Sequence, residues 1–461
     1  MFKFSKIGLS AVLVYLAYLS SVQAQEAPGG AQDNPVRAGN AQTGPIQTDK
    51  YRATYVKLGA SNAEGLLYEP AKQGSKSDVA VVFTFPRATF GAEPAPELAS
   101  RGYRVLLVTP FTEDESPFDG VRETSQGIKY MRTLPGIQRV VVMSHSGGGR
   151  MMAFYVDVAL NGPAACQNPE ILYPCKTEEA TDLAKPDGLV LLDSAPGAFN
   201  TAVSIDPAFA GNERTNLKLD MYSAANGFDA KAGSARYSDD FRKRYFAAQS
   251  ARNMEIVNNA VAQLKLLQEG KATYKGDMPL VIPGAVDGGF AASLHHVDTS
   301  LLSHTKHPHT LLKADGTAPE VVIQSVRPPI GSQNARELNS LCCDSLNYTV
   351  RHFLANDAIR TTKDFAETED DILGVDWKSS LRSTPGSAEG ITVPTLVLAM
   401  SCFQFIVPDE IIYDHLAAKD KTYAAVEGAL HNFGPCKPDY GDTKKRTFDF
   451  VDNWLSKPGR F

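Results

Sequence analysis

The sequence predicts an α/β protein: a doubly wound, mostly parallel sheet with a large, mainly helical insertion after the sixth strand. Three observations lead to this prediction. Strand and helix signals alternate from residue 78 to residue 193, regular alternation is lost over residues 199–390, and it resumes from residue 394 to the end. Alternating strands and helices favour a parallel sheet with helices on both faces.

The strands of the first half are nearly continuous in apolar residues, as expected of strands buried on both faces. Asp78–Phe85 contains five Val and Phe residues. Further strands are predicted at residues 104–109, 138–144 and 188–193, with helices at 94–102, 121–134 and 148–160. After the insertion we expect a strand at 394–400, a helix at 409–418, a strand at 421–427 and a closing helix at 443–455.

Residues 199–390 contain a long helical pattern over about 239–269, a His-rich segment and Pro-rich turns. We interpret this segment as a cap over the core, which would consist of residues 51–198 and 391–461. The alternative is an independent binding domain inserted into the sheet, which would keep a closed core of its own.

The N-terminus has the features of a secretory signal peptide over residues 1–24. Lys3 and Lys6 precede an apolar run, and a small-x-small site ends at Ala24, after which we expect cleavage. An uncleaved anchor is the alternative, although the run is shorter than the about 20 residues that span a bilayer. Residues 25–50 lack an apolar period and are interpreted as a disordered linker. The protein is therefore predicted to be secreted or periplasmic.

Composition excludes some partners. The hydrophobic fraction of 43% is ordinary for a globular protein, and the formal net charge is -6. Basic runs interleaved with aromatic residues are missing, so nucleic acid is not expected as a partner. After signal cleavage, no second long apolar stretch predicts a membrane span.

The run from Val140 to Met152 is the most informative motif, because a β-branched strand breaks there into a Ser-centred, Gly-rich turn that leads into a helix. Ser144 and Gly148 are small residues on either side of Ser146, as a nucleophile elbow requires. The chain thus resembles the α/β-hydrolase superfamily, with Ser144 in place of the usual first glycine. The alternative is a packing turn or a phosphate cradle, but no Lys-Ser or Lys-Thr follows the glycines.

The resemblance implies a triad in the order Ser, acid, His. His431 lies just after the last predicted strand, where the superfamily carries its histidine. The usual site of the acid, after the seventh strand, has Gln404 instead. The segment that contains Asp193 looks like the acid-bearing segment of the pancreatic-type lipases, so Asp193 is the predicted acid, with Glu410 and then Asp409 as alternatives.

The oxyanion of the tetrahedral intermediate needs two N–H donors. The backbone N–H of Gly147 is the first by position. The second should come from the loop after the strand Asp78–Phe85, where Pro86 has no N–H and Arg87 is the candidate.

Six cysteines in a secreted chain favour disulfides. Cys166 and Cys175 bracket a short loop, and a Cys402–Cys436 bond would join two loops at the edge of the site. The adjacent Cys342 and Cys343 could pair or remain thiols. The histidines from His295 to His309 match no zinc spacing, so we interpret them as polar surface and predict no metal and no cofactor.

The main hypothesis is a secreted serine hydrolase that cleaves a small-molecule or polymeric carboxylic ester through an acyl-enzyme. An amidase or lactonase on the same triad is an alternative. The competing class is an inactive hydrolase fold kept as a binding protein, which Ser144, Gln404 and the Phe85–Pro86 loop would favour.

Overall fold

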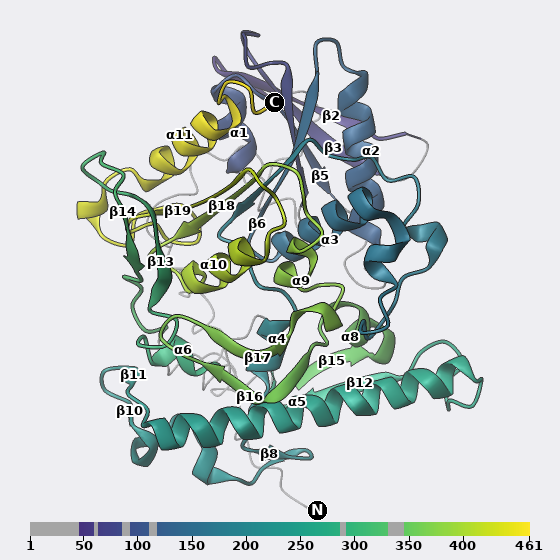
Figure 1. The fold of residues 1–461 in the computed structure, drawn as a ribbon, viewed down its shortest axis with the longest axis vertical. Helices are drawn as coiled ribbons and strands as arrows, with labels where there is room; N and C mark the ends of the chain where they lie inside the picture. The colour runs from purple at the N-terminus through teal and green to yellow at the C-terminus, as the bar shows by residue number, and fades with distance from the viewer. Residues whose placement is uncertain (1–45, 60–62, 85–92, 110–117, 286–291, 331–344) are drawn as a thin grey trace, which may run out of the picture. The chain divides into compact units, whose positions relative to one another are not determined.

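A computed structural model describes residues 46–59, 63–84, 93–109, 118–285, 292–330 and 345–461. Within these ranges eleven strands form one central sheet in the order β1-β2-β3-β5-β4-β6-β7-β18-β19-β13-β14 (Figure 1). The strands are β1 (Ile46–Gln47), β2 (Tyr51–Lys57), β3 (Glu64–Pro70), β4 (Val79–Thr84), β5 (Arg104–Thr109), β6 (Arg139–His145), β7 (Gly188–Leu192), β13 (His304–Leu312), β14 (Glu320–Gln324), β18 (Thr395–Met400) and β19 (Lys421–Val426).

The sheet is parallel through its centre and antiparallel at its edges. Neighbours from β5 through β4, β6, β7, β18 and β19 to β13 run parallel. The pairs β1–β2, β2–β3 and β3–β5 at one edge are antiparallel, as is β13–β14 at the other. Parallel neighbours need crossover connections, which helices supply. The predicted doubly wound, mostly parallel sheet is confirmed.

Helices cover both faces of the sheet because its central strands are apolar on both sides. Every residue of β4 is buried. Val81 packs in one apolar cluster with residues of α1 and α11, while the next residue, Val82, packs in another with residues of α2, α3 and α10. The helices are α1 (Pro94–Ser100), α2 (Asp119–Thr133), α3 (Gly148–Asn161), α10 (Ile406–His415) and α11 (Thr443–Leu455).

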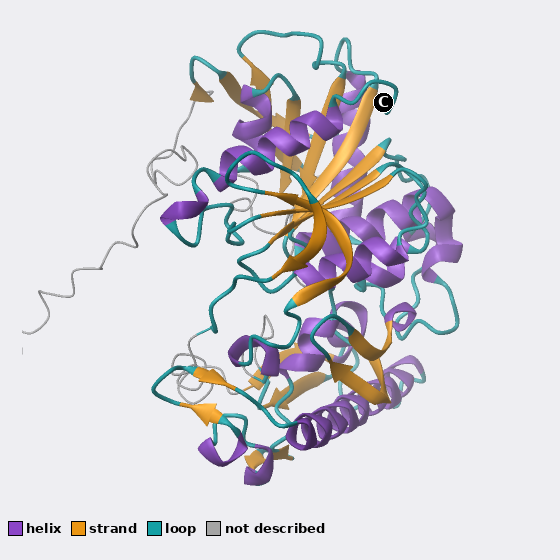
Figure 2. Ribbon diagram, turned by 60° about the vertical axis from the view of Figure 1, so that its left-hand side comes forward, coloured by secondary structure: helices purple, strands orange, loops and turns teal. Residues whose placement is uncertain are grey.

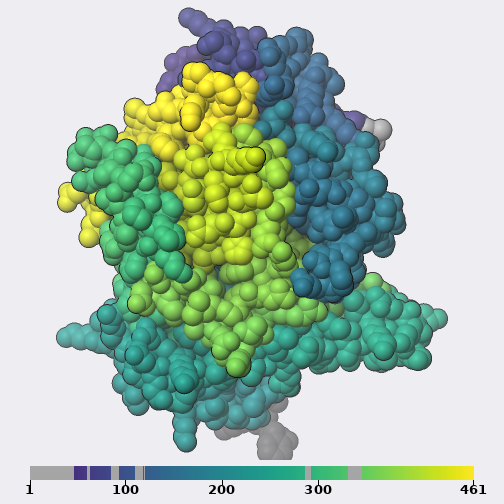
Figure 3. Space-filling model, viewed as in Figure 1, coloured from purple at the N-terminus to yellow at the C-terminus, as the bar shows by residue number. Residues whose placement is uncertain are grey.

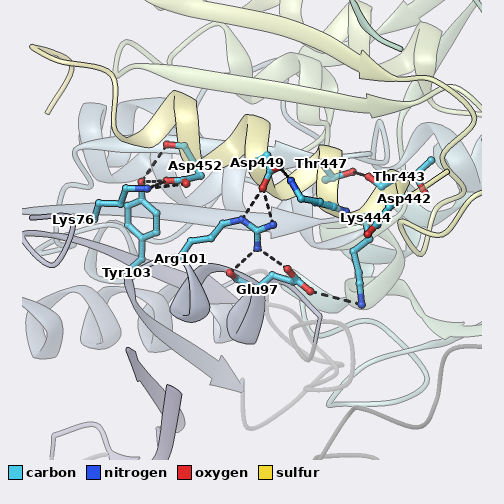
Figure 4. Close-up of polar contacts among 11 residues, drawn as sticks. Lys76, Glu97, Arg101, Tyr103, Asp442, Thr443, Lys444, Thr447, Asp449 and Asp452 are labelled. Carbon is cyan, nitrogen blue, oxygen red and sulfur yellow. Dashed lines mark hydrogen bonds and ion pairs between the residues drawn. The ribbon is translucent and has the colours of Figure 1, made fainter. Parts of the chain in front are cut away.

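Ion pairs and a hydrogen bond join the C-terminal helix α11 to α1 and to residues just before β4 and β5 (Figure 4). Arg101 lies 2.6 Å from a Glu97 oxygen and 2.9 Å from an Asp449 oxygen. Asp452 accepts hydrogen bonds from Lys76 Nζ at 2.6 Å and from the hydroxyl of Tyr103 at 2.8 Å. The position of α11 fixes where the loop between β19 and α11 begins and ends.

Between β7 and β18, which are parallel neighbours in the sheet, the chain makes a long excursion. We call residues 199–390 the insert. Its elements outside the central sheet are α4 (Phe199–Ser204), β8 (Phe209–Ala210), β9 (Glu213–Arg214), β10 (Phe228–Asp229), β11 (Ser234–Ala235), α5 (Asp239–Gln268), β12 (Pro279–Pro283), α6 (Leu294–Val297), β15 (Ser345–Thr349), α8 (Val350–Asn356), β16 (Arg360–Glu367), β17 (Ile372–Asp376) and α9 (Thr384–Ala388).

The long helix α5 agrees with the predicted helical pattern. The hydroxyl of Ser238 accepts the N–H of Phe241 and caps its first turn, where Asp239 and Asp240 also favour the helix dipole. Figure 2 shows α5 as the long helix on the side of the insert away from the sheet. In the space-filling view of Figure 3 the insert (teal to light green) adjoins the C-terminal part of the chain (yellow-green to yellow).

The insert differs from the prediction in composition. The sequence predicts a mainly helical segment, but in its described part four two-stranded ribbons accompany the helices: β8–β9, β10–β11, β12–β15 and β16–β17. The segment Arg360–Glu367 illustrates the reason. Its Thr-rich sequence has buried residues at intervals with exposed ones between them, which suits a ribbon with one packed face.

The insert is also not one uninterrupted excursion over 199–390. Strand β13 pairs in parallel with β19, with Leu311 opposite Ala425, and β14 then pairs with β13. Residues 304–324 therefore extend the central sheet rather than a cap. The physical reason is the edge of β19, whose unpaired backbone groups need a partner strand.

The rest of the insert shares a core with the sheet and also has one of its own. Phe199 and Tyr245 belong to the same apolar cluster as Val82. A separate cluster around Val257 and Phe353 lies almost wholly within the insert. Across the described ranges, no helix is both long and apolar enough to cross a membrane.

Candidate active site

The turn that carries Ser146 connects β6 to α3. Ser146 has a left-handed backbone conformation with φ 58°, which is unfavourable for a residue other than glycine. Backbone hydrogen bonds hold it: its N–H donates to Leu192 O, and its carbonyl accepts the N–H groups of Gly149 and Ala195. A Cβ at Gly149 would lie 1.9 Å from Ser194 Oγ, so this position requires glycine. The turn lifts the Ser146 hydroxyl above the ends of the strands.

His431 and Asp193 meet Ser146 at this edge of the sheet. His431 lies in the loop after β19, and Asp193 directly follows β7. His431 Nε2 lies 2.7 Å from Ser146 Oγ, and His431 Nδ1 lies 2.5 Å from Asp193 Oδ2. The structure thus brings together the three side chains that the sequence predicts as nucleophile, base and acid.

Asp193 is fully buried and is held from several sides. Its other carboxylate oxygen accepts the N–H of Met400 at 3.1 Å. Burial raises the pKa of Asp193, while its hydrogen bonds with His431 and Met400 oppose this rise. Asp193 also has a positive φ, 44°, so this predicted acid, like Ser146, lies on a strained turn.

A second buried carboxyl group, Asp409, lies beside this turn. Its Oδ1 accepts the N–H of Ser194 at 3.0 Å, and the side chain is inaccessible to solvent. Burial first, and then the negative charge of Asp193, raise the pKa of Asp409 well above its usual value. Asp409 therefore supports the backbone next to Asp193 through its hydrogen bond with Ser194.

Of the other residues considered at the acid site, Glu410 contacts β13 and Gln404 lies near Ser146. Glu410 accepts the N–H groups of Lys306 at 2.6 Å and His307 at 2.9 Å, and its Oε1 lies 2.8 Å from His309 Nε2. Those contacts attach α10 to β13. Gln404 lines the pocket beside Ser146.

Aromatic rings enclose the imidazole of His431. Phe403 stacks on it with centroids 4.2 Å apart, and His145 lies 4.4 Å away on a tilted ring. His145 Nε2 is also 2.8 Å from the carbonyl oxygen of His431. Burial, together with repulsion from His431, lowers the pKa of His145 well below its usual value. The neutral form of His145 is therefore favoured.

Of the two predicted oxyanion donors, Gly147 lies within the described residues and Arg87 does not. Gly147 precedes the first residue of α3 and lines the pocket beside Ser146, so its backbone lies at the positive end of a helix. Arg87, the other predicted donor, lies outside the described residues. Cys342 and Cys343 also lie outside them.

Both predicted disulfides with described residues are present. Cys166 and Cys175 are bonded, as are Cys402 and Cys436. The second bond joins the loop after β18 to the loop that carries His431. The bond therefore holds together the loops that carry Phe403 and His431, whose rings stack on each other.

A cavity of about 220 Å³ opens beside Ser146. Its residues come from both the core and the insert. The lining residues are Ser146, Gly147, Arg150, Ala195, Gly197, Asn200, Thr201, Asp357, Phe403, Gln404, Phe405 and His431. Asn200, Thr201 and Asp357 belong to the insert, so the side chains that the insert adds to the cavity are polar.

Sequence reasoning missed the ion pair at the back of this cavity. Arg150 Nη1 lies 3.1 Å from Asp357 Oδ1, and His352 Nε2 lies 3.2 Å from Asp357 Oδ2. Asp357 is buried, yet these two partners lower its pKa below the usual value. The position of Arg150, four residues after Ser146 on α3, was an available signal, but no pattern in the sequence points to Asp357.

The His-rich segment does not form a metal centre in the described part of the chain, where no group of three or more His, Cys, Asp or Glu side chains is placed to hold an ion. His295 Nδ1 pairs with Glu367 at 2.8 Å, and His309 pairs with Glu410. These histidines are largely buried, so the interpretation of the segment as polar surface is wrong for them.

Solved structures with some similarity to this chain include three enzymes. A soluble variant of monoglyceride lipase from Saccharomyces cerevisiae is 10% identical, with 93% of this chain and 97% of that chain covered and a TM-score of 0.38. An α/β hydrolase from Penicillium sp. sh18 is 11% identical over 89% and 99%, with a TM-score of 0.37. Proline iminopeptidase from Mycobacterium smegmatis is 12% identical over 87% and 97%, with a TM-score of 0.36.

At TM-scores this low, these similarities support neither a fold nor a reaction for this chain. No protein-family model and no curated protein matches the chain.

Proposed function

We propose that the chain is a secreted serine hydrolase of the α/β-hydrolase superfamily that cleaves a carboxylic ester through an acyl-enzyme. The main support is one hydrogen-bonded series: Ser146 Oγ, His431 and Asp193, joined at 2.7 Å and 2.5 Å. A serine hydroxyl is a weak nucleophile until a base takes its proton, and the base needs a third group to fix its tautomer.

In the first half of the reaction, Ser146 Oγ attacks the ester carbonyl carbon while its proton passes to His431 Nε2. Asp193 accepts the Nδ1–H of His431 and stabilises the imidazolium. The carbonyl oxygen becomes an oxyanion that the N–H groups of Gly147 and Arg87 would bind. The tetrahedral intermediate then collapses, the C–O bond to the alcohol breaks, and the alcohol leaves with the proton from His431.

In the second half, water replaces the alcohol. His431 takes a proton from that water as it attacks the acyl carbon, and the same oxyanion donors act again. The bond to Ser146 Oγ breaks, and the serine recovers its proton from His431. The products are one carboxylic acid and one alcohol, and this sequence of steps needs no cofactor.

We assign the insert, apart from β13 and β14, the role of a cap. Asn200, Thr201 and Asp357 in the lining of the Ser146 cavity support this role, because a separate binding domain would not contribute to that cavity. The apolar cluster that Phe199 shares with Val82 supports it as well.

A direct test is labelling with a fluorophosphonate, together with hydrolysis of p-nitrophenyl acetate and butyrate. We expect the wild-type protein to be labelled on Ser146 and to release p-nitrophenol, and Ser146→Ala to do neither at an unchanged melting temperature. Ser144→Ala removes a hydroxyl two residues away and should still be labelled. If the wild-type protein is neither labelled nor active, the inactive binding protein becomes the better hypothesis.

Secretion has a separate test, because the signal peptide at residues 1–24 lies outside the described residues. Intact mass and N-terminal sequencing of the exported protein should give a chain that begins at Gln25. A chain that retains Met1 would contradict the proposal.

A further inference from the structure

The loop between β18 and α10, residues 401–405, lies where the α/β-hydrolase superfamily usually carries its triad acid. In the mechanism proposed above the acid is Asp193, which comes from the end of β7. What the loop brings to His431 is instead the ring of Phe403. The loop therefore contacts the predicted base through an aromatic side chain.

Three bonds fix this loop to the segment 428–436, which contains His431. They are the hydrogen bond from the N–H of Gly428 to Ser401 Oγ at 2.8 Å, the hydrogen bond from the N–H of Cys402 to Ala429 O at 3.0 Å, and the Cys402–Cys436 disulfide. Because two of these bonds involve Cys402, the next residue, Phe403, has little freedom to move relative to His431.

The rings of Phe403 and His431 lie face to face. Their centroids are 4.2 Å apart, and their planes differ by 20°. Phe405, which is 6% exposed, meets both rings nearly at right angles, with its centroid 5.0 Å from that of Phe403 and 5.7 Å from that of His431. The hydrogen bonds to Ser146 and Asp193 restrain the imidazole within its plane, and the stacked ring restrains it across that plane.

This stacking acts differently on the charged and the neutral imidazole. The face of a phenyl ring carries a partial negative charge and attracts a cation that lies within about 6 Å of its centroid. His431 becomes such a cation when it takes the proton of Ser146. An interaction that strengthens as the transition state forms raises kcat rather than lowering KM.

We propose that Phe403 is a positioning residue that acts through His431: its ring holds the imidazole between Ser146 and Asp193 and stabilises the imidazolium that forms when the ester is attacked. This inference rests on the proposed function and adds a residue to its machinery. Asp193 meets the imidazolium at Nδ1, whereas Phe403 meets its face, so the two contributions differ in geometry.

The stabilisation of the imidazolium is tested by replacing Phe403 with phenylalanines that carry one, two or three fluorine atoms. Fluorine withdraws electron density from the face of the ring and leaves its shape nearly unchanged. We expect kcat for p-nitrophenyl butyrate to fall with each added fluorine, by about 5-fold across the series, while KM and the melting temperature stay nearly constant. A kcat that is the same in all three proteins and the wild type would overturn this part of the proposal.

The requirement for a ring is tested with three variants. Phe403→Leu keeps an apolar side chain and removes the ring, so kcat should fall about 10-fold with a smaller change in KM. Phe403→Tyr keeps the ring and should restore most of the lost kcat. Phe450→Leu makes the same substitution on α11, outside the lining of the cavity, and should keep the wild-type kcat.

Two further results distinguish failure of this inference from failure of the proposed function. If a fluorophosphonate labels Ser146 of the wild-type protein and Phe403→Leu is as active as Phe403→Tyr, the role of Phe403 is overturned and the hydrolase proposal stands. Absence of labelling and of hydrolysis in the wild-type protein would overturn the proposed function, and the role of Phe403 with it. The fluorinated series decides the role of Phe403 even if Phe403→Leu fails to fold.

Discussion

At the scale of single residues, the site is built on two turns with strained backbone conformations. Ser146 and Asp193 both have positive φ values, and both lie where a parallel strand ends. Strain of this kind persists only where the surrounding contacts enforce it. His431 lies between these two turns, 2.7 Å from Ser146 Oγ and 2.5 Å from Asp193 Oδ2.

The first prediction concerns Asp193→Asn. The amide cannot stabilise an imidazolium as a carboxylate does, and its NH₂ group favours the wrong tautomer of His431. We expect kcat for p-nitrophenyl butyrate to fall by about 10⁴-fold with little change in KM. Circular dichroism and the melting temperature serve as the control for folding. A loss below tenfold would place the triad acid elsewhere.

The second prediction concerns the stability conferred by Asp409 at different pH values. The folded protein keeps this carboxyl protonated because its pKa is raised, whereas the unfolded chain releases the proton above about pH 4. The contribution of Asp409 is therefore fully present below that pH. It falls by about 1.4 kcal/mol per pH unit as the pH rises toward the folded pKa.

Asp409→Asn removes this titration and keeps an oxygen that can accept the N–H of Ser194. The melting temperature of the variant should equal that of the wild type near pH 4 and exceed it by a growing margin toward pH 7. A constant difference across this range would mean that Asp409 is ionised in the folded protein.

At the scale of elements, the sequence predicts the core well because its signals are local. Strand β4 was predicted at Asp78–Phe85 and observed at Val79–Thr84, and the helix predicted over about 239–269 is α5, Asp239–Gln268. The positions of Ser146, Asp193 and His431 could also be predicted, because each residue follows a strand that is recognisable in the sequence. Helix α10 begins earlier than predicted, at Ile406, because apolar residues after β18 continue into its first turn.

What the sequence could not supply depends on contacts between distant segments. Strand β13 contains His307 and Pro308, which are uncommon in strands, so its sequence does not predict a strand. It joins the sheet because it pairs with the edge of β19. The partnership of Arg150 with Asp357 joins residues more than 200 positions apart. Neither periodicity nor spacing reports such a pairing.

The third prediction concerns the attachment of α10 to β13. Glu410→Ala removes the acceptor for the N–H groups of Lys306 and His307 and leaves both unsatisfied beside the sheet. We expect a loss of about 3 kcal/mol in the free energy of unfolding, measured with urea. Glu410→Gln keeps one acceptor oxygen and should lose clearly less. Equal stability of the Ala variant and the wild type would contradict this role.

At the scale of the whole molecule, two disulfides and a predicted signal peptide agree with each other, because disulfides persist in oxidising compartments. The two bonds differ in the length of chain that they close. Cys166 and Cys175 are 9 residues apart, and Cys402 and Cys436 are 34 apart. The longer loop loses more entropy in the unfolded chain.

The fourth prediction follows from this difference. Replacing Cys402 and Cys436 together with serine should lower the free energy of unfolding by about 4 kcal/mol, and replacing Cys166 and Cys175 by about 3 kcal/mol. Chemical denaturation of the two double variants measures both values. The first variant should also lose esterase activity before it unfolds, since its bond joins the loops of Phe403 and His431. A first variant as active and as stable as the wild type would contradict this role.

The route of the chain through the insert has a consequence for engineering. The chain leaves the sheet after β7, returns to place β13 and β14 beside β19, leaves again, and returns at β18. A chimaera that exchanged residues 199–390 as one module would remove β13 from the edge of β19 and expose a row of unpaired backbone groups, which invites aggregation. Two modules could be exchanged instead, one on each side of the β13–β14 hairpin. A graft that retains this hairpin keeps β19 paired with β13.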